Sequence, residues 1–178
     1  TEAEDIHAVV AGVLTHRLDT VGKKVHTGRS RNDQIALDER LYLKNAIDDL
    51  QQEILNLISV LLDISKNHTE TLISGYTHMQ RAQPVTLAHH LCSWAWMIKR
   101  DFERLSDAKK RIDFCPLGSG ALAGSGLPLN REMVAESLGF SGVTQNSLDS
   151  VADRDYCIEL SSCFSILMMH LSRFCEEV

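Results

Sequence analysis

DQIALDERLYLKNAIDDLQQEILNLISVLLDISKNH, residues 33–68, is the stretch that decides the fold. Its apolar residues recur mainly three and four positions apart, and neither Gly nor Pro interrupts them. This spacing predicts one helix of about 35 residues, roughly 50 Å long at 1.5 Å per residue. Since a helix of this length needs partners along its sides, the stretch indicates a helical bundle rather than a compact small domain.

Two further long helices are expected on the C-terminal side of this stretch. One runs from about Val85 to Ile112, and the basic residues in its last turns suit the negative end of the helix dipole. The other starts near Ser147 and runs to the end of the chain, with apolar residues again three and four positions apart. The pattern therefore predicts three long helices in one bundle.

The segments between these helices carry turn and capping signals. A loop is expected over residues 69–84, and no strand-like alternation of useful length appears. The Gly- and Pro-rich run 116–128 cannot continue a helix and favours close backbone approach. Asn130 is expected to cap a short helix over residues 131–138, which Gly139 closes. The predicted fold class is therefore all-α, a long-helix bundle with short connecting helices and loops.

The chain is expected to divide near the start of its longest helix. Residues 1–32 are predicted to form an N-terminal helix and an anion-binding loop, and residues 33–178 part of a central helical-bundle domain. Glu2, Glu4 and Asp5 suit the first turn of a helix already under way. The C-terminus falls inside an apolar helical pattern without a terminator. Both ends are therefore expected to be cuts in a longer protein.

The composition is that of an ordinary globular protein with a solvated acidic surface. Of its 178 residues, 44% are hydrophobic and 24% are charged, and the formal net charge is −6. Nothing in this balance points to nucleic acid or an anionic membrane as a partner, and no apolar stretch is long enough to cross a bilayer. Five cysteines without a C-x-x-C pair predict reduced thiols in a cytoplasmic protein.

A donor-rich segment, HTGRSRNDQ at residues 26–34, lies immediately before the longest helix. Backbone N–H groups at a helix start are unpaired and carry partial positive charge. Guanidinium, hydroxyl and amide side chains around them make a pocket suited to carboxylates. A simpler interpretation stays open on these residues alone, namely a polar turn in which Asn32 or Asp33 caps the helix.

Two other polar segments are candidates for chemistry. GYTHMQRAQP at residues 75–84 places His78 in a loop, where an imidazole could move a proton near neutral pH, although an ordinary hydrogen-bonding role stays open. NSLDSVADRD at residues 146–155 opens the third long helix. Arg154 in this segment is a candidate for binding an anion, and a surface or capping role stays open. No His and carboxylate spacing in the chain predicts a metal site.

The order and spacing of four segments, at 26–34, 75–84, 116–124 and 146–155, resemble those of argininosuccinate lyases in the fumarase/aspartase superfamily. The first motif, HTGRSRND, separates this family from adenylosuccinate lyase and fumarase, which share the Thr-His of the second motif. The resemblance implies a bundle built from three central helices of the fumarase/aspartase-type fold. It also implies a carbon–nitrogen lyase of arginine biosynthesis that reversibly cleaves argininosuccinate to L-arginine and fumarate, without a metal or organic cofactor.

The resemblance also implies roles for individual residues. Ser30, Arg31 and Asn32 match the family's carboxylate-binding positions. Thr77 matches a substrate-binding threonine, and His78 matches the catalytic histidine. The family's catalytic serine is expected beyond the end of this chain, so the choice between that serine and the histidine as the base stays open.

The family's assembly sets further expectations. Its sites are built from three subunits of a homotetramer, and His7 falls in a segment near the site. The chain by itself is therefore expected to be inactive, with further copies and a small-molecule substrate as partners, and neither nucleic acid nor a membrane. Two alternatives stay open: a non-catalytic structural protein like the δ-crystallins, and another lyase of the superfamily such as adenylosuccinate lyase. The presence of His78 and of HTGRSRND gives no sign of lost chemistry.

Overall fold

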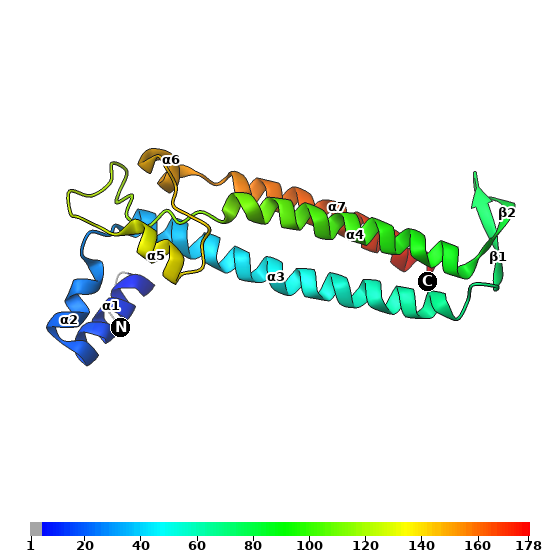
Figure 1. Ribbon diagram of the computed structural model, residues 1–178, viewed down its shortest axis with the longest axis horizontal. Helices are drawn as coiled ribbons and strands as arrows, with labels where there is room; N and C mark the ends of the chain where they lie inside the picture. The colour runs from blue at the N-terminus through cyan, green and yellow to red at the C-terminus, as the bar shows by residue number, and fades with distance from the viewer. Residues whose placement is uncertain (1–4) are drawn as a thin grey trace. The chain divides into compact units, whose positions relative to one another are not determined.

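The computed structural model describes residues 5–178, which are mostly helical (Figure 1). The chain divides into two compact units. Unit 1 contains the described residues up to Glu39 together with residues 114–153, and unit 2 contains residues 40–113 and 154–178. The long helix α3, Arg31–Lys66, supplies residues to both units.

Unit 2 is a helical bundle formed by α4 (Leu87–Ile112), α7 (Asp155–Glu177) and most of α3. Figure 1 shows α4 and α7 side by side. Many of the buried apolar residues recur seven positions apart, so that each helix turns one face to the core. The residues with this spacing are Ile47, Ile54 and Leu61 on α3, Ile98, Leu105 and Ile112 on α4, and Leu160 and Leu167 on α7.

The first two of the three predicted long helices are confirmed with shifts of two residues. The helix α3 contains 36 residues and ends at Lys66 rather than at His68. The helix α4 begins at Leu87, where the Thr86 hydroxyl accepts a hydrogen bond from the N–H of His89 at 3.2 Å. The all-α fold class is confirmed as a mainly helical chain.

The segment expected to be a loop, residues 69–84, is instead largely an antiparallel hairpin. Its strands β1 (Leu72–Thr77) and β2 (Gln80–Thr86) pair from Leu72 opposite Thr86 to Thr77 opposite Gln80. The prediction of a loop was wrong because pairing satisfies the backbone groups while most side chains of both strands stay exposed. A hairpin without a buried face needs no alternation of apolar and polar residues.

A buried polar group lies in the core of unit 2. Asp101 on α4 and His170 on α7 are 1% and 7% exposed, and His170 Nδ1 lies 2.6 Å from Asp101 Oδ2. Arg104 donates to the other carboxylate oxygen at 2.8 Å. Both oxygens of this buried carboxylate are therefore paired, which offsets the cost of removing the charge from water.

Unit 1 is made of short helices and loops around the start of α3. As predicted, Asn130 caps a short helix, accepting from the N–H of Met133 at 3.0 Å, and Gly139 follows that helix with a φ of +71°. The short elements are α1 (Ile6–Leu18), α2 (Thr20–Lys23), the 3-10 helix η1 (Lys24–His26), α5 (Arg131–Ser137) and α6 (Ser147–Ala152).

The first helix begins later than its sequence suggests. The Asp5 side chain accepts from the N–H of Ala8 at 2.8 Å and so occupies the N-cap of α1, which begins at Ile6. Asp5 therefore precedes the helix instead of lying in a turn already under way. Glu2 and Glu4 lie outside the described residues.

The third predicted long helix is two helices, α6 and α7. Asp153 has an extended ψ of 127°, and its N–H bonds to the carbonyl of Asp149 at 2.8 Å, which ends α6. The apolar period from which one helix was predicted fails here, because Asp153, Arg154 and Asp155 offer no apolar side chain for burial. Continuing the helix through them would therefore gain no core contact.

Candidate functional site

The start of α3 carries a reciprocal cap. Ser30 Oγ accepts from the N–H of Asn32 at 3.3 Å, and the N–H of Ser30 donates to Asp33 Oδ1 at 2.9 Å. This is a capping box, in which side chains three residues apart satisfy two unpaired backbone donors. Gly28 has a φ of +70°, a left-handed conformation that suits glycine. Residues 26–34 thus form a tight turn into α3 with Ser30 at the N-cap.

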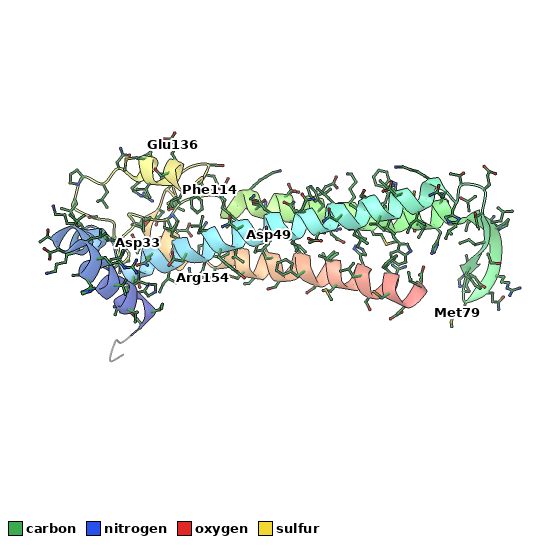
Figure 2. The ribbon with its side chains drawn as sticks, turned by 90° about the horizontal axis from the view of Figure 1, so that it is seen from below. Asp33, Asp49, Met79, Phe114, Glu136 and Arg154 are labelled. Carbon is green, nitrogen blue, oxygen red and sulfur yellow. The ribbon has the colours of Figure 1, made fainter. Side chains whose placement is uncertain are left out.

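Asp33 joins this turn to the Gly-rich loop of unit 1. Figure 2 labels it near the start of α3, and its side chain is 0% exposed. Its Oδ2 accepts from the N–H groups of Gly118 at 3.0 Å and Gly120 at 2.8 Å. The predicted close backbone approach in the Gly-rich run is therefore an approach to this carboxylate.

The three residues predicted to bind a carboxylate lie together at this helix start. Arg31 Nη1 lies 2.6 Å from Asp5 Oδ2 in a partly exposed ion pair. Asn32 Nδ2 donates to the carbonyl of Ala121 at 3.1 Å. The Ser30 hydroxyl accepts one hydrogen bond and so keeps its hydrogen for donation. The arrangement offers hydroxyl, amide and guanidinium donors to an anion.

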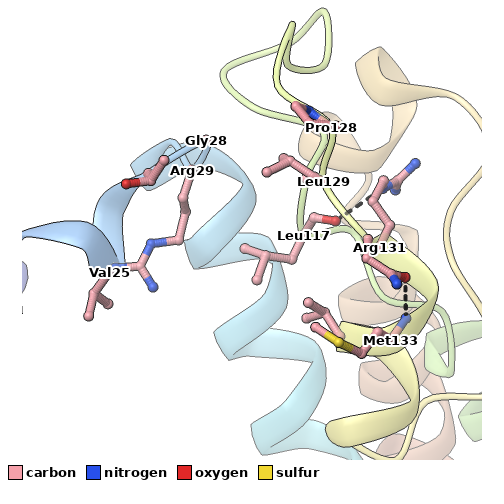
Figure 3. Close-up of a pocket in the computed structure, with 12 residues that line it drawn as sticks. Val25, Gly28, Arg29, Leu117, Pro128, Leu129, Arg131 and Met133 are labelled. Atoms are coloured by element: carbon pink, nitrogen blue, oxygen red, sulfur yellow. Dashed lines mark hydrogen bonds between the residues drawn. The ribbon is translucent and has the colours of Figure 1, made fainter. Parts of the chain in front are cut away.

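Two cavities flank this turn within unit 1. The cavity in Figure 3, about 310 Å³, is lined by apolar side chains such as Leu117, Leu129 and Met133, together with Arg29 and Arg131. The second cavity, about 240 Å³, lies between α1 and the start of α3. Its polar lining residues are His7, His26, Arg29, Gln34 and Asp38. His7, which the resemblance places near the site, therefore lies beside the turn.

His78 lies at the tip of the hairpin in unit 2, where the backbone is strained. His78 and Met79 have φ values of 52° and 60°, between the paired residues Thr77 and Gln80. Positive φ at both central positions is the pattern of a type I′ turn, which normally selects Asn or Gly. Figure 2 shows Met79 at the end of the hairpin, and its side chain is 98% exposed. The predicted loop position of His78 is thus a tight, accessible turn.

A cavity of about 580 Å³ lies beside β1 and α4 in unit 2. His90 Nε2 on α4 and Glu177 Oε2 at the end of α7 line it and lie 3.2 Å apart. Tyr76 of β1 also lines the cavity, whereas Thr77 and His78 do not. This cavity is therefore next to the hairpin strand and not at its tip.

The third polar segment contains a helix cap. The Asn146 side chain accepts from the N–H groups of Leu148 at 3.0 Å and Asp149 at 3.2 Å, and so caps α6. Arg154, labelled in Figure 2, occupies the N-cap position of α7. Asn146 is therefore the side chain that caps a helix in this segment, whereas the Arg154 side chain makes no capping hydrogen bond to α7.

The two predicted parts of the site belong to different units. The turn 26–34 lies in unit 1, and the hairpin with Thr77 and His78 lies in unit 2.

Two buried carboxylates were not identified from the sequence as anchors. The Ser-x-x-Asp spacing of Ser30 and Asp33, ahead of an apolar helix, is a capping-box signal that could have identified the first. No such signal exists for Asp101, whose partner His170 is 69 positions away. Only the packing of α4 against α7 brings that pair together.

The described part of the chain contains no cluster of metal-binding side chains, no disulfide bond and no membrane-spanning helix. Among residues 5–178, no group of three or more His, Cys, Asp or Glu side chains is arranged to hold a metal ion. The cysteines are free thiols, and burial raises the pKa of the Cys163 thiol. Within the same residues, no helix is both long enough and apolar enough to cross a membrane.

The sequence is similar to known lyases along nearly its whole length. A family profile described as Lyase matches residues 2–178. The argininosuccinate lyase of Acetivibrio thermocellus is 57% identical over 177 residues, and that of Clostridium beijerinckii is 60% identical over 176 residues. These alignments cover 99% of this chain but only 39% and 38% of the two relatives. The chain therefore spans less than two fifths of the length of these curated relatives.

Solved lyase structures share the fold. The crystal structure of EDDS lyase in complex with formate has a TM-score of 0.89 and 31% identity, covering 94% of this chain and 34% of that one. A fumarate lyase:delta crystallin from Brucella melitensis bound to cobalt has a TM-score of 0.82 at 19% identity, covering 96% and 40%, a likeness of fold alone. Because the family profile covers residues 2–178, the chain belongs to the lyase family.

Proposed function

We propose that the protein containing this chain is an argininosuccinate lyase, which reversibly eliminates L-arginine from argininosuccinate to give fumarate. The observation that carries the proposal is 57% and 60% identity to two curated argininosuccinate lyases over nearly the whole chain. Since the chain spans 38–39% of those relatives, the activity is proposed for the longer protein. The turn 26–34 and the hairpin tip at His78 are the parts of the site that this chain supplies.

Ser30, Arg31 and Asn32 hold the carboxylate at the fumarate end of the substrate in this proposal. Elimination removes a proton from the carbon beside a carboxylate, and negative charge collects on that carboxylate. Fixed donors at a helix start stabilise this charge because they need no reorganisation as it develops. Solved structures of EDDS lyase with formate and of its variant with bound fumarate support a carboxylate ligand in this fold.

Thr77 contacts the substrate in this proposal, and His78 transfers a proton. The exposed His78 side chain is accessible, and histidine is the side chain that most often serves as a general acid or base. The positive φ of His78 supports a functional role, since such strain persists chiefly where a side chain is used. Two versions of the proposal stay open for the carbon-bound proton, one with His78 as the base and one with a serine outside this chain.

The complete site is proposed to form between copies of the protein in a homotetramer. In the family that the sequence resembles, each site is built from three subunits, so the turn 26–34 and the hairpin tip with His78 come from different copies in this proposal. The unit 2 helices carry exposed apolar side chains that suit such association. Examples are Val60, Trp96, Ile158 and Met168, which are 54%, 62%, 72% and 61% exposed. A full-length protein that is monomeric by light scattering would contradict this assembly.

The proposed function is tested on the full-length protein. Incubation with argininosuccinate should release fumarate, followed by ultraviolet absorbance, and the rate should persist with EDTA because no metal or organic cofactor is proposed. Release of fumarate from adenylosuccinate alone would instead favour a sister lyase. A folded protein that cleaves neither compound would contradict the proposal and favour a structural protein like the δ-crystallins. We place the enzyme in arginine biosynthesis in the cytoplasm, in line with its free thiols.

A further inference from the structure

Asp33 is a buried carboxylate beside the proposed carboxylate-binding turn, and the proposed chemistry does not use it. Its side chain is 0% exposed and accepts hydrogen bonds from three backbone N–H groups. The Ser30 N–H donates to Oδ1, and the N–H groups of Gly118 and Gly120 donate to Oδ2. Such charge-assisted bonds are strong, so Asp33 firmly links the turn to a loop 85–87 positions away.

The Gly-rich loop is shaped around this carboxylate. Gly118 and Gly120 have φ values of +94° and +65°, which L side chains rarely adopt. A Cβ at Gly120 would lie 2.6 Å from the carbonyl oxygen of Gly124, and a Cβ at Gly118 would lie 2.8 Å from Arg131 Cγ. Arg131 Nε in turn donates to the carbonyl of Leu117 at 3.1 Å. The loop therefore has no room for side chains at these two positions, and its backbone directs both glycine N–H groups at Asp33.

Each carboxylate oxygen of Asp33 is connected through hydrogen bonds to a residue of the proposed binding site. On the Oδ1 side, the bond to the Ser30 N–H fixes the backbone from which the Ser30 hydroxyl projects. On the Oδ2 side, the bond to Gly120 fixes the loop whose Ala121 carbonyl accepts from the Asn32 amide at 3.1 Å. Removing the carboxylate would therefore release two binding side chains at once.

We propose that Asp33 is the positioning residue for the carboxylate end of the substrate. It sets the Ser30 hydroxyl and the Asn32 amide through the capping box and through the Gly118–Gly120 backbone, without touching the substrate. Ser30 Oγ accepts from the Asn32 N–H, so its hydrogen is directed to another acceptor, and a substrate carboxylate is that acceptor. Small displacements of such donors weaken binding strongly. This inference rests on the proposed function.

Asp33→Asn in the full-length protein is the isosteric test. Asparagine has one oxygen and one NH₂ group, so it loses either the Ser30 bond or both glycine bonds. Fumarate affinity, measured as competitive inhibition of argininosuccinate cleavage, should fall about 10-fold or more, as expected for a lost hydrogen bond to a charged group. Asp49→Asn, which changes an exposed carboxylate on the same helix, is the matched control and should bind fumarate like the wild type.

The double variant Ser30→Ala/Asn32→Ala, with and without Asp33→Asn, completes a cycle that separates positioning from stability. If Asp33 acts through Ser30 and Asn32, adding Asp33→Asn to this double variant should weaken fumarate binding by less than about 3-fold, because both side chains to be positioned are already gone. Losses that multiply in full, measured on equally folded samples by circular dichroism, would overturn the proposal.

Gly118→Ala gives a second approach if Asp33→Asn does not fold. It keeps the carboxylate and displaces one of its donors, so fumarate affinity should fall, and the Ser30→Ala/Asn32→Ala background should again mask the loss. An unchanged affinity in folded Gly118→Ala protein would overturn the inference. Failure of the proposed function is distinguishable, because then the wild type itself would neither cleave argininosuccinate nor bind fumarate.

Discussion

The turn 26–34 and the tip of the β1–β2 hairpin carry two parts of one proposed site, yet they hold their side chains by opposite means. In the turn, a buried Asp33 carboxylate ties Ser30 to a loop far away in the sequence. At the tip, His78 is exposed and its position depends on a strained two-residue turn. Binding a charge requires donors that do not move, whereas proton transfer requires a side chain that reaches the substrate. Substitutions in the distant Gly-rich loop should therefore affect the turn 26–34. At the hairpin tip, only substitutions of the tip residues themselves should have an effect.

The largest expected effect is on activity at the hairpin tip. His78→Asn in the full-length protein should lower kcat by at least about 100-fold, the low end for a general acid–base group. Its urea denaturation midpoint should stay near the wild-type value, because the side chain is exposed. The exposed His16→Asn serves as the control, and near-normal kcat in His78→Asn would remove this residue from its role.

On the side of the turn, Gly120→Ala should mainly affect stability. Its new Cβ would lie 2.6 Å from a backbone carbonyl, whereas a Cβ at Gly124 meets nothing within 4 Å, although both glycines have positive φ. Gly120→Ala should therefore cost about 2 kcal/mol more than Gly124→Ala in urea denaturation, a typical overpacking penalty. Equal costs for the two variants would show that the loop is not held closely around Asp33.

A smaller effect, on folding stability, is expected from relieving the backbone strain at the hairpin tip. Met79→Gly and Met79→Ala remove the same exposed side chain, but only glycine adopts a φ of 60° without penalty. Met79→Gly should therefore be more stable than Met79→Ala by about 1 kcal/mol. If chemical denaturation shows the alanine variant to be the more stable, the left-handed turn is not part of the folded hairpin.

The smallest effect is expected at the ion pair between Arg31 and Asp5. Asp5→Asn removes the charge but keeps a side chain that caps α1. Because the two side chains are 44% and 32% exposed, solvent screens the pair, and its loss should cost less than about 1 kcal/mol. Added salt should reduce the difference from wild type further, and a difference that persists at high salt would point to a role beyond the ion pair.

Helix periodicity predicted most of the fold because long helices repeat a local pattern. The apolar residues of 33–68 lie on one face whatever their partners are, so α3 was placed to within two residues. The same reasoning failed at the hairpin, whose strands have no buried face, and at Asp153 and Arg154, where a helix stops within an apolar pattern. Both failures concern segments without a core contact of their own.

For the candidate site, the sequence predicts which residue types the turn offers but not how they are connected. The Asn130 cap and the donor-rich turn followed from local spacing. The role of Asp33 did not, because its glycine donors are 85 and 87 positions away and only φ values above zero turn their N–H groups toward it. The pair of Asp101 and His170 could not be predicted for the same reason, because the two residues are 69 positions apart.

By itself, the sequence determined the long helices, the caps and the family resemblance, since each depends on residues within a few positions of one another. Tertiary structure alone decided which carboxylates are buried, which backbone groups neutralise them and how the turn before α3 is held. The physical reason is that a buried charge must find donors wherever the fold places them. For Asp33 those donors are backbone N–H groups, whose position no side-chain pattern records, and for Asp101 one partner is a histidine 69 positions away.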